Sequence, residues 1–229
     1  MSKKLNPRAK IPLIVALVVV FGLLFRVGLD KFFYKEPNLA IAPPIDAEDI
    51  GDRFIQTASQ NFFYHEFDQA IENYKKAIAL FEKRKNFKRA ARTYESIGDT
   101  YKFSRNLKEA KNAYIAAAGY HQELQNKIGE ARAMKKMGEL YMEYSEFGKA
   151  GEWFGKASVK VRDAKPHIDK AKIYEAQGHY FLKMEQIYKA LGSFEEAKAT
   201  FDEIGYPLGY DNISPMIQRL KRQQKNNVT

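Results

Sequence analysis

Apolar residues recur along most of this chain at the spacing of one helix face, in blocks that repeat every 40 positions. In the second block these positions are occupied by Ala90, Ala91, Tyr94, Ile97, Gly98 and Tyr101. Their spacing predicts a helix from about Phe87 to Phe103. Residues 104–106 interrupt the pattern, and Asn106 followed by Glu109 is typical of the start of a second helix. Each block therefore predicts a pair of helices.

The same residue types return at equivalent positions of four blocks. Small residues form one column, at Ala58, Gly98, Gly138 and Gly178. Alanine forms two more, at Ala70, Ala110, Ala150 and Ala190, and at Ala77, Ala117, Ala157 and Ala197. Aromatic residues stand between the alanines, at Tyr74, Tyr114, Phe154 and Phe194. Large residues beside small ones are what closely packed helices require, so the columns predict a solenoid of stacked helix pairs.

These columns resemble the tetratricopeptide repeat (TPR) family from about Asp46 to Glu203. The usual TPR period is about 34 residues, and the longer period of this chain is similar to that of kinesin light chain, rapsyn and the soluble NSF attachment proteins. The resemblance implies an all-α, right-handed superhelix of four helix-turn-helix repeats that binds other proteins. The repeats are expected at about 47–86, 87–126, 127–166 and 167–205.

A last amphipathic segment follows the repeats, within residues 206–229. Its apolar residues have the spacing of one helix face, at Ile213, Met216, Ile217 and Leu220. Gly205 is a helix-stop signal just before it. We expect a capping helix that covers the apolar end of the solenoid and is followed by a basic tail. The alternative is a basic amphipathic helix that lies on a membrane surface.

The first residues of the chain predict a membrane anchor. A basic tail, residues 1–10, precedes an apolar stretch within residues 11–34 in which Arg26 is the one interruption between Ile11 and Leu29. As a helix this stretch spans about 28 Å, close to the roughly 30 Å thickness of a bilayer core. A Pro-containing linker, residues 35–45, connects it to the repeats. The alternatives are a cleaved signal peptide and a buried core helix.

The flanking Lys and Arg residues indicate an orientation for this anchor. The positive-inside rule places the N-terminus in the cytoplasm and the repeats outside, with a bacterial inner membrane facing the periplasm as the favoured setting. The opposite topology stays open, because Arg26, Lys31 and Lys35 follow the apolar stretch.

The net charge of +10 is concentrated at the two ends of the chain. Residues 1–45 carry a net charge of +5 and residues 218–229 carry +4, which leaves +1 for residues 46–217. A nearly neutral solenoid is a poor candidate for tracking nucleic-acid phosphates, so we expect no nucleic-acid partner.

Motifs for catalysis or cofactor binding are absent from the sequence. The chain holds no Gly-rich phosphate loop, no G-x-S-x-G and no H-E-x-x-H, and it has no cysteine. The four histidines, His65, His121, His167 and His179, lack metal-ligand spacing, and we expect them to be solvated or edge residues. We expect neither an enzyme nor a metal or cofactor site.

The resemblance implies that the first helices of the repeats line a concave groove for a protein or peptide. Candidate groove residues form a basic row, an acidic row, a mixed row and an apolar end: Phe62, Phe63, Arg92, Glu95, Asp99, Lys102, Phe103, Arg132, Lys135, Glu139, Met142, Lys172 and Glu175. The alternative is that the basic row, Arg92, Arg132 and Lys172, pairs with acids of neighbouring repeats and binds nothing else. Charge reversal of Arg92 and Arg132 is the test that follows from the sequence.

Three functions fit these features. The first is a membrane-anchored adaptor or scaffold that binds a partner through its groove, in assembly, secretion or chaperoning. The second is a permanent structural subunit of a membrane complex. The third is a fusion factor similar to the soluble NSF attachment proteins, against which the predicted anchor argues. The oligomeric state is left open.

Overall fold

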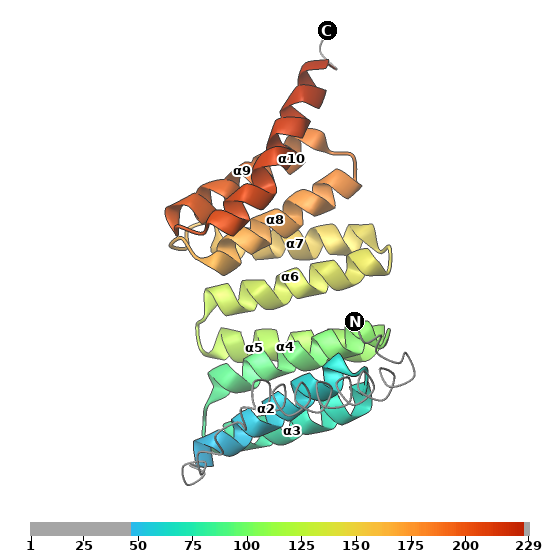
Figure 1. The fold of residues 1–229 in the computed structure, drawn as a ribbon, viewed down its shortest axis with the longest axis vertical. Coiled ribbons are helices and arrows are strands. Elements are labelled where there is room, and N and C mark those ends of the chain that lie inside the picture. Colours follow the sequence, from blue (N-terminus) through green and yellow to red (C-terminus); the bar gives the residue numbers. More distant parts are fainter. Residues whose placement is uncertain (1–46, 227–229) are drawn as a thin grey trace, which may run out of the picture. The chain divides into compact units, whose positions relative to one another are not determined.

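The structure, a computed structural model, describes residues 47–226. This part of the chain forms nine α-helices and no strand, and each helix packs against the next (Figure 1). The predicted all-helical repeat solenoid is therefore confirmed. The helices are α2 (Ala47–Phe63), α3 (Phe67–Lys83), α4 (Phe87–Phe103), α5 (Leu107–Glu123), α6 (Lys127–Glu143), α7 (Phe147–Val161), α8 (Ile168–Lys183), α9 (Ile187–Glu203) and α10 (Pro207–Asn226).

The predicted tail (1–10), membrane-spanning helix (11–34) and linker (35–45) lie outside the described residues. None of the helices between residues 47 and 226 has the length and apolar character needed to cross a bilayer. The anchor therefore stays a prediction from the sequence.

Most turns between helices share one geometry, which sets the spacing of the repeats. At the α4–α5 turn, Arg105 adopts a φ of 60°, and its backbone N–H donates to Lys102 O at 3.0 Å. The next N–H, of Asn106, donates to Tyr101 O at 2.8 Å. These two bonds define a Schellman motif. Asn106 also begins α5, because its side chain accepts a hydrogen bond from Glu109 N at 3.3 Å, which confirms the predicted cap.

This turn explains the period of the sequence. A 17-residue helix such as α4 and a three-residue turn together take 20 residues, so a helix pair takes 40. Positive φ angles accordingly recur at 20-residue intervals, at His65, Lys85, Arg105, Gln125, Ser145, Glu185 and Gly205. None of these residues is β-branched, as the left-handed region of backbone space requires.

The α7–α8 joint departs from this pattern because of Pro166. This residue stands where the Schellman motif needs a backbone N–H, and proline has none. Helix α7 instead ends at Val161, and α8 begins at Ile168. Lys170 Nζ donates to Arg162 O at 2.9 Å, the position of Lys102 O in the regular turn, and to Ala164 O at 2.8 Å.

The columns of small and aromatic residues form the core as predicted, and the structure shows what the glycines accommodate. In the second, third and fourth pairs, an aromatic ring from the second helix lies against the glycine of the first helix. A Cβ atom added to Gly98 would lie 2.3 Å from the Tyr114 ring, and one added to Gly138 would lie 2.9 Å from the Phe154 ring. The missing side chain makes room for a ring, at the cost of about 1 kcal/mol of helix propensity.

Helix α10 closes the C-terminal end of the solenoid. Ile213, Ile217 and Leu220 are buried and pack in one cluster with Phe194 and Phe201 of α9. The predicted cap is therefore confirmed, and the apolar face of α10 is not free to lie on a membrane. The helix begins at Pro207, earlier than the apolar spacing suggested, because proline is favoured in the first turn.

Candidate functional site

The predicted groove residues lie on the first helices of the four repeats. Helix α2 carries two of them, α4 five, α6 four and α8 two: Phe62 and Phe63; Arg92, Glu95, Asp99, Lys102 and Phe103; Arg132, Lys135, Glu139 and Met142; Lys172 and Glu175. They do not form one continuous surface. The structure divides them into an open cleft, a buried polar cluster, an aromatic group and separate exposed side chains.

The open cleft lies between α6 and α8, which contact each other although they are not consecutive in the chain. Its cavity volume is about 330 Å³, and its walls include five of the predicted residues: Lys135, Glu139, Met142, Lys172 and Glu175. Phe154, Ala176 and His179 complete the lining. Charged side chains of both signs thus surround an apolar interior, which suits an apolar side chain of a partner flanked by polar groups.

The charges of this cleft are only partly paired with each other. Lys135 Nζ lies 2.6 Å from Glu139 Oε1, one helical turn further along α6. No other described residue forms an ion pair with Lys172 or Glu175, and Lys172 is exposed. The His179 ring packs edge-on against Phe194, with ring centroids 5.1 Å apart, which fixes one wall. The α8 side of the cleft therefore offers free charges.

The buried polar cluster joins three repeats through Arg132. Its Nε and Nη2 atoms donate to the two carboxylate oxygens of Glu95 at 2.8 and 2.9 Å, and Nη1 donates to Asp169 Oδ2 at 2.8 Å. Glu95 also lies 3.0 Å from His121 Nε2. The guanidinium thus connects α4 of one repeat to α8 two repeats later. For Arg132 the structure favours the alternative in which the basic row pairs with acids of neighbouring repeats.

Contacts within the cluster keep Glu95 and Arg132 ionised. Burial opposes the charge on Glu95, but hydrogen bonds from His121 and Arg132 and the Arg132 charge outweigh it, so the pKa of Glu95 lies below its ordinary value. Burial likewise opposes the charge on Arg132, and its bonds to Glu95 together with the Asp169 charge raise its pKa. Both groups therefore stay charged in the folded protein.

His121 completes this cluster, and the expectation that it is solvated is wrong. Its side chain has no exposed area. Asn126 begins α6 by accepting from Gly129 N at 3.0 Å through Oδ1, so its Nδ2 atom faces His121 Nδ1 at 3.3 Å and donates to it. The imidazole proton then lies on Nε2, directed at Glu95. The residue's place within the helix face, rather than its type, was the signal for burial.

Asp99 forms a second polar contact between repeats. It accepts two hydrogen bonds from Lys136 Nζ, at 2.8 and 2.6 Å, and one from the Tyr114 hydroxyl at 2.6 Å. Burial and the Asp99 carboxylate raise the pKa of the Tyr114 phenol well above its ordinary value. Asp99 therefore holds the ring that packs on Gly98, and Lys136, which the sequence analysis did not select, is its cation.

The aromatic group partly matches the predicted apolar end. Phe62 and Phe103 pack edge to face with ring centroids 5.1 Å apart. Phe63 is 75% exposed and packs instead on Tyr64, with a centroid distance of 5.4 Å. Phe62 and Phe103 thus form a real contact between two repeats, whereas Phe63 points away from it.

The two remaining predicted residues lie outside the cleft and the buried polar cluster. Arg92 is exposed and has no ion pair within residues 47–226. Lys102 Nζ lies over the Phe103 ring, 5.6 Å from its centroid. Neither residue lines the α6–α8 cleft.

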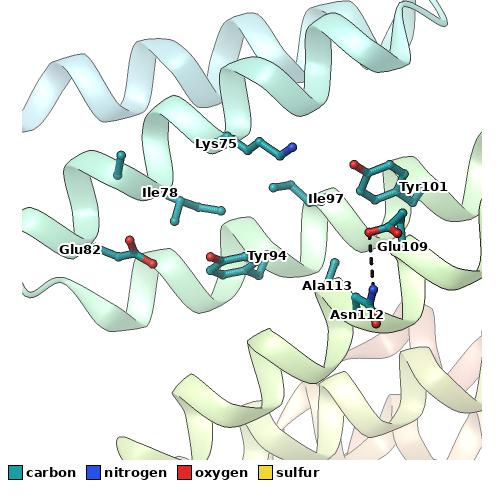
Figure 2. A pocket seen from close by; sticks show the side chains of 10 residues that line it. Lys75, Ile78, Glu82, Tyr94, Ile97, Tyr101, Glu109, Asn112 and Ala113 are labelled. Carbon is teal, nitrogen blue, oxygen red and sulfur yellow. Dashed lines mark hydrogen bonds between the residues drawn. The ribbon is translucent and has the colours of Figure 1, made fainter.

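A second cavity, which the sequence analysis missed, lies among α3, α4 and α5 (Figure 2). Its volume is about 420 Å³, and Ile78, Tyr94 and Ile97 lie around it, with Lys75 and Glu82 among its polar residues. The Tyr120 hydroxyl donates to Glu82 beside it.

The remaining histidines agree with the expectation that they are solvated or edge residues. His65, His167 and His179 are exposed, and His167 Nδ1 accepts from Asp169 N at 3.0 Å at the start of α8. No group of His, Cys, Asp and Glu within the described part of the chain has the geometry to hold a metal ion.

Stacked helix pairs with small and aromatic columns define a TPR-like helical repeat solenoid. The family model of the soluble NSF attachment protein (SNAP) matches residues 44–165, more than half of the sequence. The chain belongs to this family. The resemblance inferred from the long repeat period is thereby supported by an independent match. No curated protein sequence matches the chain significantly.

Solved structures agree with this fold. The apo form of RapI superposes with a TM-score of 0.63 at 15% identity, covering 88% of this chain and 55% of RapI. Aspartyl phosphate phosphatase F from Bacillus subtilis gives a TM-score of 0.64 at 15% identity, with coverages of 87% and 50%. This chain thus spans about half the length of these two proteins.

Repeats from a putative kinesin light chain of Podosopora anserina are also similar. They give a TM-score of 0.51 at 9% identity and cover 78% of this chain and 98% of their own. At such identities the likeness extends to the fold alone.

Proposed function

We propose that this protein is a non-catalytic adaptor that binds an extended segment of a partner protein in the α6–α8 cleft, while residues 11–34 anchor it in a membrane. The cleft carries the proposal. It gathers five of the predicted groove residues around an apolar interior, and Lys172 and Glu175 keep charges that no neighbouring repeat neutralises. A partner can therefore place an apolar side chain inside and pair its own charges with the rim.

Family membership supports a binding role. The family is named for attachment of NSF, which is a contact between proteins rather than a reaction. A helical-repeat surface is preorganised, so a partner segment loses little more than its own freedom on binding. An affinity in the micromolar range, about 8 kcal/mol, is then within reach of modest contacts.

Membrane attachment is supported by the apolar stretch and by its charged flanks. We propose that the N-terminus lies in the cytoplasm and the repeats lie outside, and protease treatment of sealed vesicles tests this. Digestion of the repeats by protease added outside intact cells or spheroplasts supports the orientation. Digestion in inverted vesicles alone reverses it.

Site-specific photocrosslinking in native membranes tests the cleft. A photoreactive residue at His179 lies in the cleft wall, and one at Val159, which is exposed on α7, serves as a matched control outside it. We expect a discrete partner to be crosslinked from position 179 and not from position 159. Equal crosslinking from both positions, or none from position 179, contradicts the proposal.

A permanent structural subunit of a membrane complex is the second candidate function, and a set of exposed aromatic side chains favours it. Phe63, Tyr64 and Phe103 are exposed near the α2–α3 and α4–α5 turns, as residues of an obligate interface would be in an isolated chain. Gentle detergent extraction separates the two functions. A subunit migrates in a stable large assembly, whereas an adaptor migrates mostly alone.

A further inference from the structure

The joint between α3 and α4 carries a dense group of positive charges, which we call the basic joint. Residues 83–92 include six cations: Lys83, Arg84, Lys85, Lys88, Arg89 and Arg92. This density stands out because residues 46–217 together have a net charge of only +1. No other ten-residue stretch within residues 46–217 contains as many Lys and Arg residues.

Most of these cations are not neutralised by the protein itself. Arg89 pairs with Asp52 and its guanidinium lies over the Phe81 ring, 4.5 Å from the centroid. The other five are exposed and form no ion pair with any residue between 47 and 226. Like charges held together repel each other, so a solvated surface gains nothing from this arrangement. An external anionic surface would relieve the repulsion.

The basic joint lies at the same edge of the solenoid as the start of α2. The Asp52–Arg89 ion pair connects the N-terminal halves of α2 and α4 directly. A Cβ atom on Gly51 would lie 2.6 Å from the Phe81 ring, near the end of α3, which places the same three helix ends together. The sequence enters this edge from residues 35–45, the segment that follows the predicted anchor.

The joint is also hollowed. Phe81, Arg84, Asn86 and Arg89 line a cavity of about 360 Å³. The Arg84 guanidinium, which forms no ion pair with residues 47–226, suits phosphate oxygens at this concave surface, because arginine donates through a planar fork.

We propose that the basic joint docks on the phosphate headgroups of an anionic bilayer and thereby orients the solenoid on the membrane. This inference rests on the proposed anchor at residues 11–34. Eleven linker residues, 35–45, span at most about 36 Å when fully extended, so the proposed anchor limits how far the start of α2 can lie from the headgroups. Each Lys or Arg near an anionic surface strengthens the contact by about fivefold.

Energy transfer in nanodiscs tests the docking with the full chain. The protein has no cysteine, so a single one can carry a donor dye. Gln122→Cys places the dye near the basic joint, because Tyr120 stacks on Phe87 with ring centroids 5.9 Å apart. Ser104→Cys places it at the α4–α5 turn, at the other end of α4. Acceptor dyes are attached to lipid headgroups, in neutral phosphatidylcholine with or without phosphatidylglycerol.

The test variant reverses four cations of the basic joint: Lys83→Glu, Arg84→Glu, Lys85→Glu and Lys88→Glu. A matched control reverses four exposed cations near the opposite turns: Arg105→Glu, Lys108→Glu, Lys183→Glu and Lys189→Glu.

In anionic discs we expect strong energy transfer from position 122, loss of this transfer in the test variant, and its retention in the control. The docking equilibrium constant should fall on the order of a hundredfold or more for four charges. High salt should abolish the transfer from position 122 in the unmodified chain.

Three results would overturn the docking. The first is energy transfer from position 122 that is the same in neutral and anionic discs. The second is an equal loss of energy transfer in the test and control variants. Displacement by inorganic phosphate at matched ionic strength is the third, since it identifies an isolated anion site rather than a lipid surface. Failure of the anchor is distinguishable, because the chain would then not copurify with neutral discs at all.

Discussion

Arg132 and Lys172 occupy equivalent positions one repeat apart, yet they have different surroundings. The Arg132 side chain is 15% exposed and donates to Glu95 and Asp169. Lys172 is exposed at the rim of the α6–α8 cleft and has no ion pair within the described helices. The same position in the repeat therefore supports the structure in one place and is available to a partner in the next.

Glu95 and Glu175 differ in the same way. Glu95 is buried between His121 and Arg132, whereas Glu175 lines the cleft and is partly exposed. His121 and Arg132, the partners of Glu95, lie 26 and 37 positions further along the chain. The equivalent positions for Glu175 hold Phe201 and Asn212, which carry no positive charge. A repeat position thus predicts where a side chain lies, while its neighbours decide what it does.

The largest expected effect comes from breaking the buried cluster at Glu95. Glu95→Ala leaves the Arg132 guanidinium with half of its partners and removes the acceptor of His121. Because the buried guanidinium then keeps only Asp169 as a counter-charge, we expect a loss of up to about 3–5 kcal/mol in the free energy of unfolding, measured by urea denaturation.

Glu175→Ala is the matched control for that substitution. It removes the same side chain at the equivalent position two repeats further, on α8 at the rim of the cleft, and should change stability by less than about 0.5 kcal/mol. Similar losses for both variants would mean that the two sites do not differ as described.

The packing of Tyr114 on Gly98 predicts a smaller effect. Asp99 holds the Tyr114 hydroxyl, so the ring cannot move away from a new methyl group. We expect Gly98→Ala to destabilise the protein by about 1–3 kcal/mol through overpacking, despite its better helix propensity.

Gly119 on α5 provides a control for which the expected change in stability has the opposite sign. A Cβ atom there meets nothing within 4 Å, so Gly119→Ala should stabilise the fold by up to about 1 kcal/mol. Thermal unfolding of the two variants measures the difference. A stabilising Gly98→Ala would contradict the ring-against-glycine packing.

Acid should weaken the buried cluster. Folding lowers the pKa of Glu95, so the folded protein binds fewer protons there than the unfolded chain does. The stability from this group is fully present above the ordinary glutamate pKa of about 4.3 and is lost as the pH falls through the lower folded value. Unfolding measured from neutral to acid pH should therefore show a steeper decline in the wild-type protein than in Glu95→Gln.

The repeat columns predicted the helices and their contacts well. Phe87–Phe103 follows from apolar spacing alone, and the cap at Asn106 follows from its own side chain, because both are local interactions. The backbone turn at Arg105 was less visible, since an ordinary polar residue takes a left-handed conformation there without glycine.

The site was harder to predict, because pairing across repeats is not local. Arg132 and Lys172 have the same position within their repeats, so the repeat pattern places both on the groove side. The pattern does not show which acidic residue of a neighbouring repeat lies next to each of them. Lys136 was missed as the partner of Asp99 for the same reason, as they lie 37 positions apart. The charge reversal of Arg92 and Arg132 that follows from the sequence would also disrupt the buried polar cluster. A loss of binding in that variant would therefore not report on binding alone.

A charge swap in the cleft tests the central difference most directly. Lys172→Glu combined with Glu175→Lys keeps the net charge and leaves Arg132 untouched. The account predicts that the partner crosslinked from position 179 is lost, while the free energy of unfolding changes by less than about 0.5 kcal/mol. Undiminished crosslinking, or a loss of stability as large as that of Glu95→Ala, would contradict it.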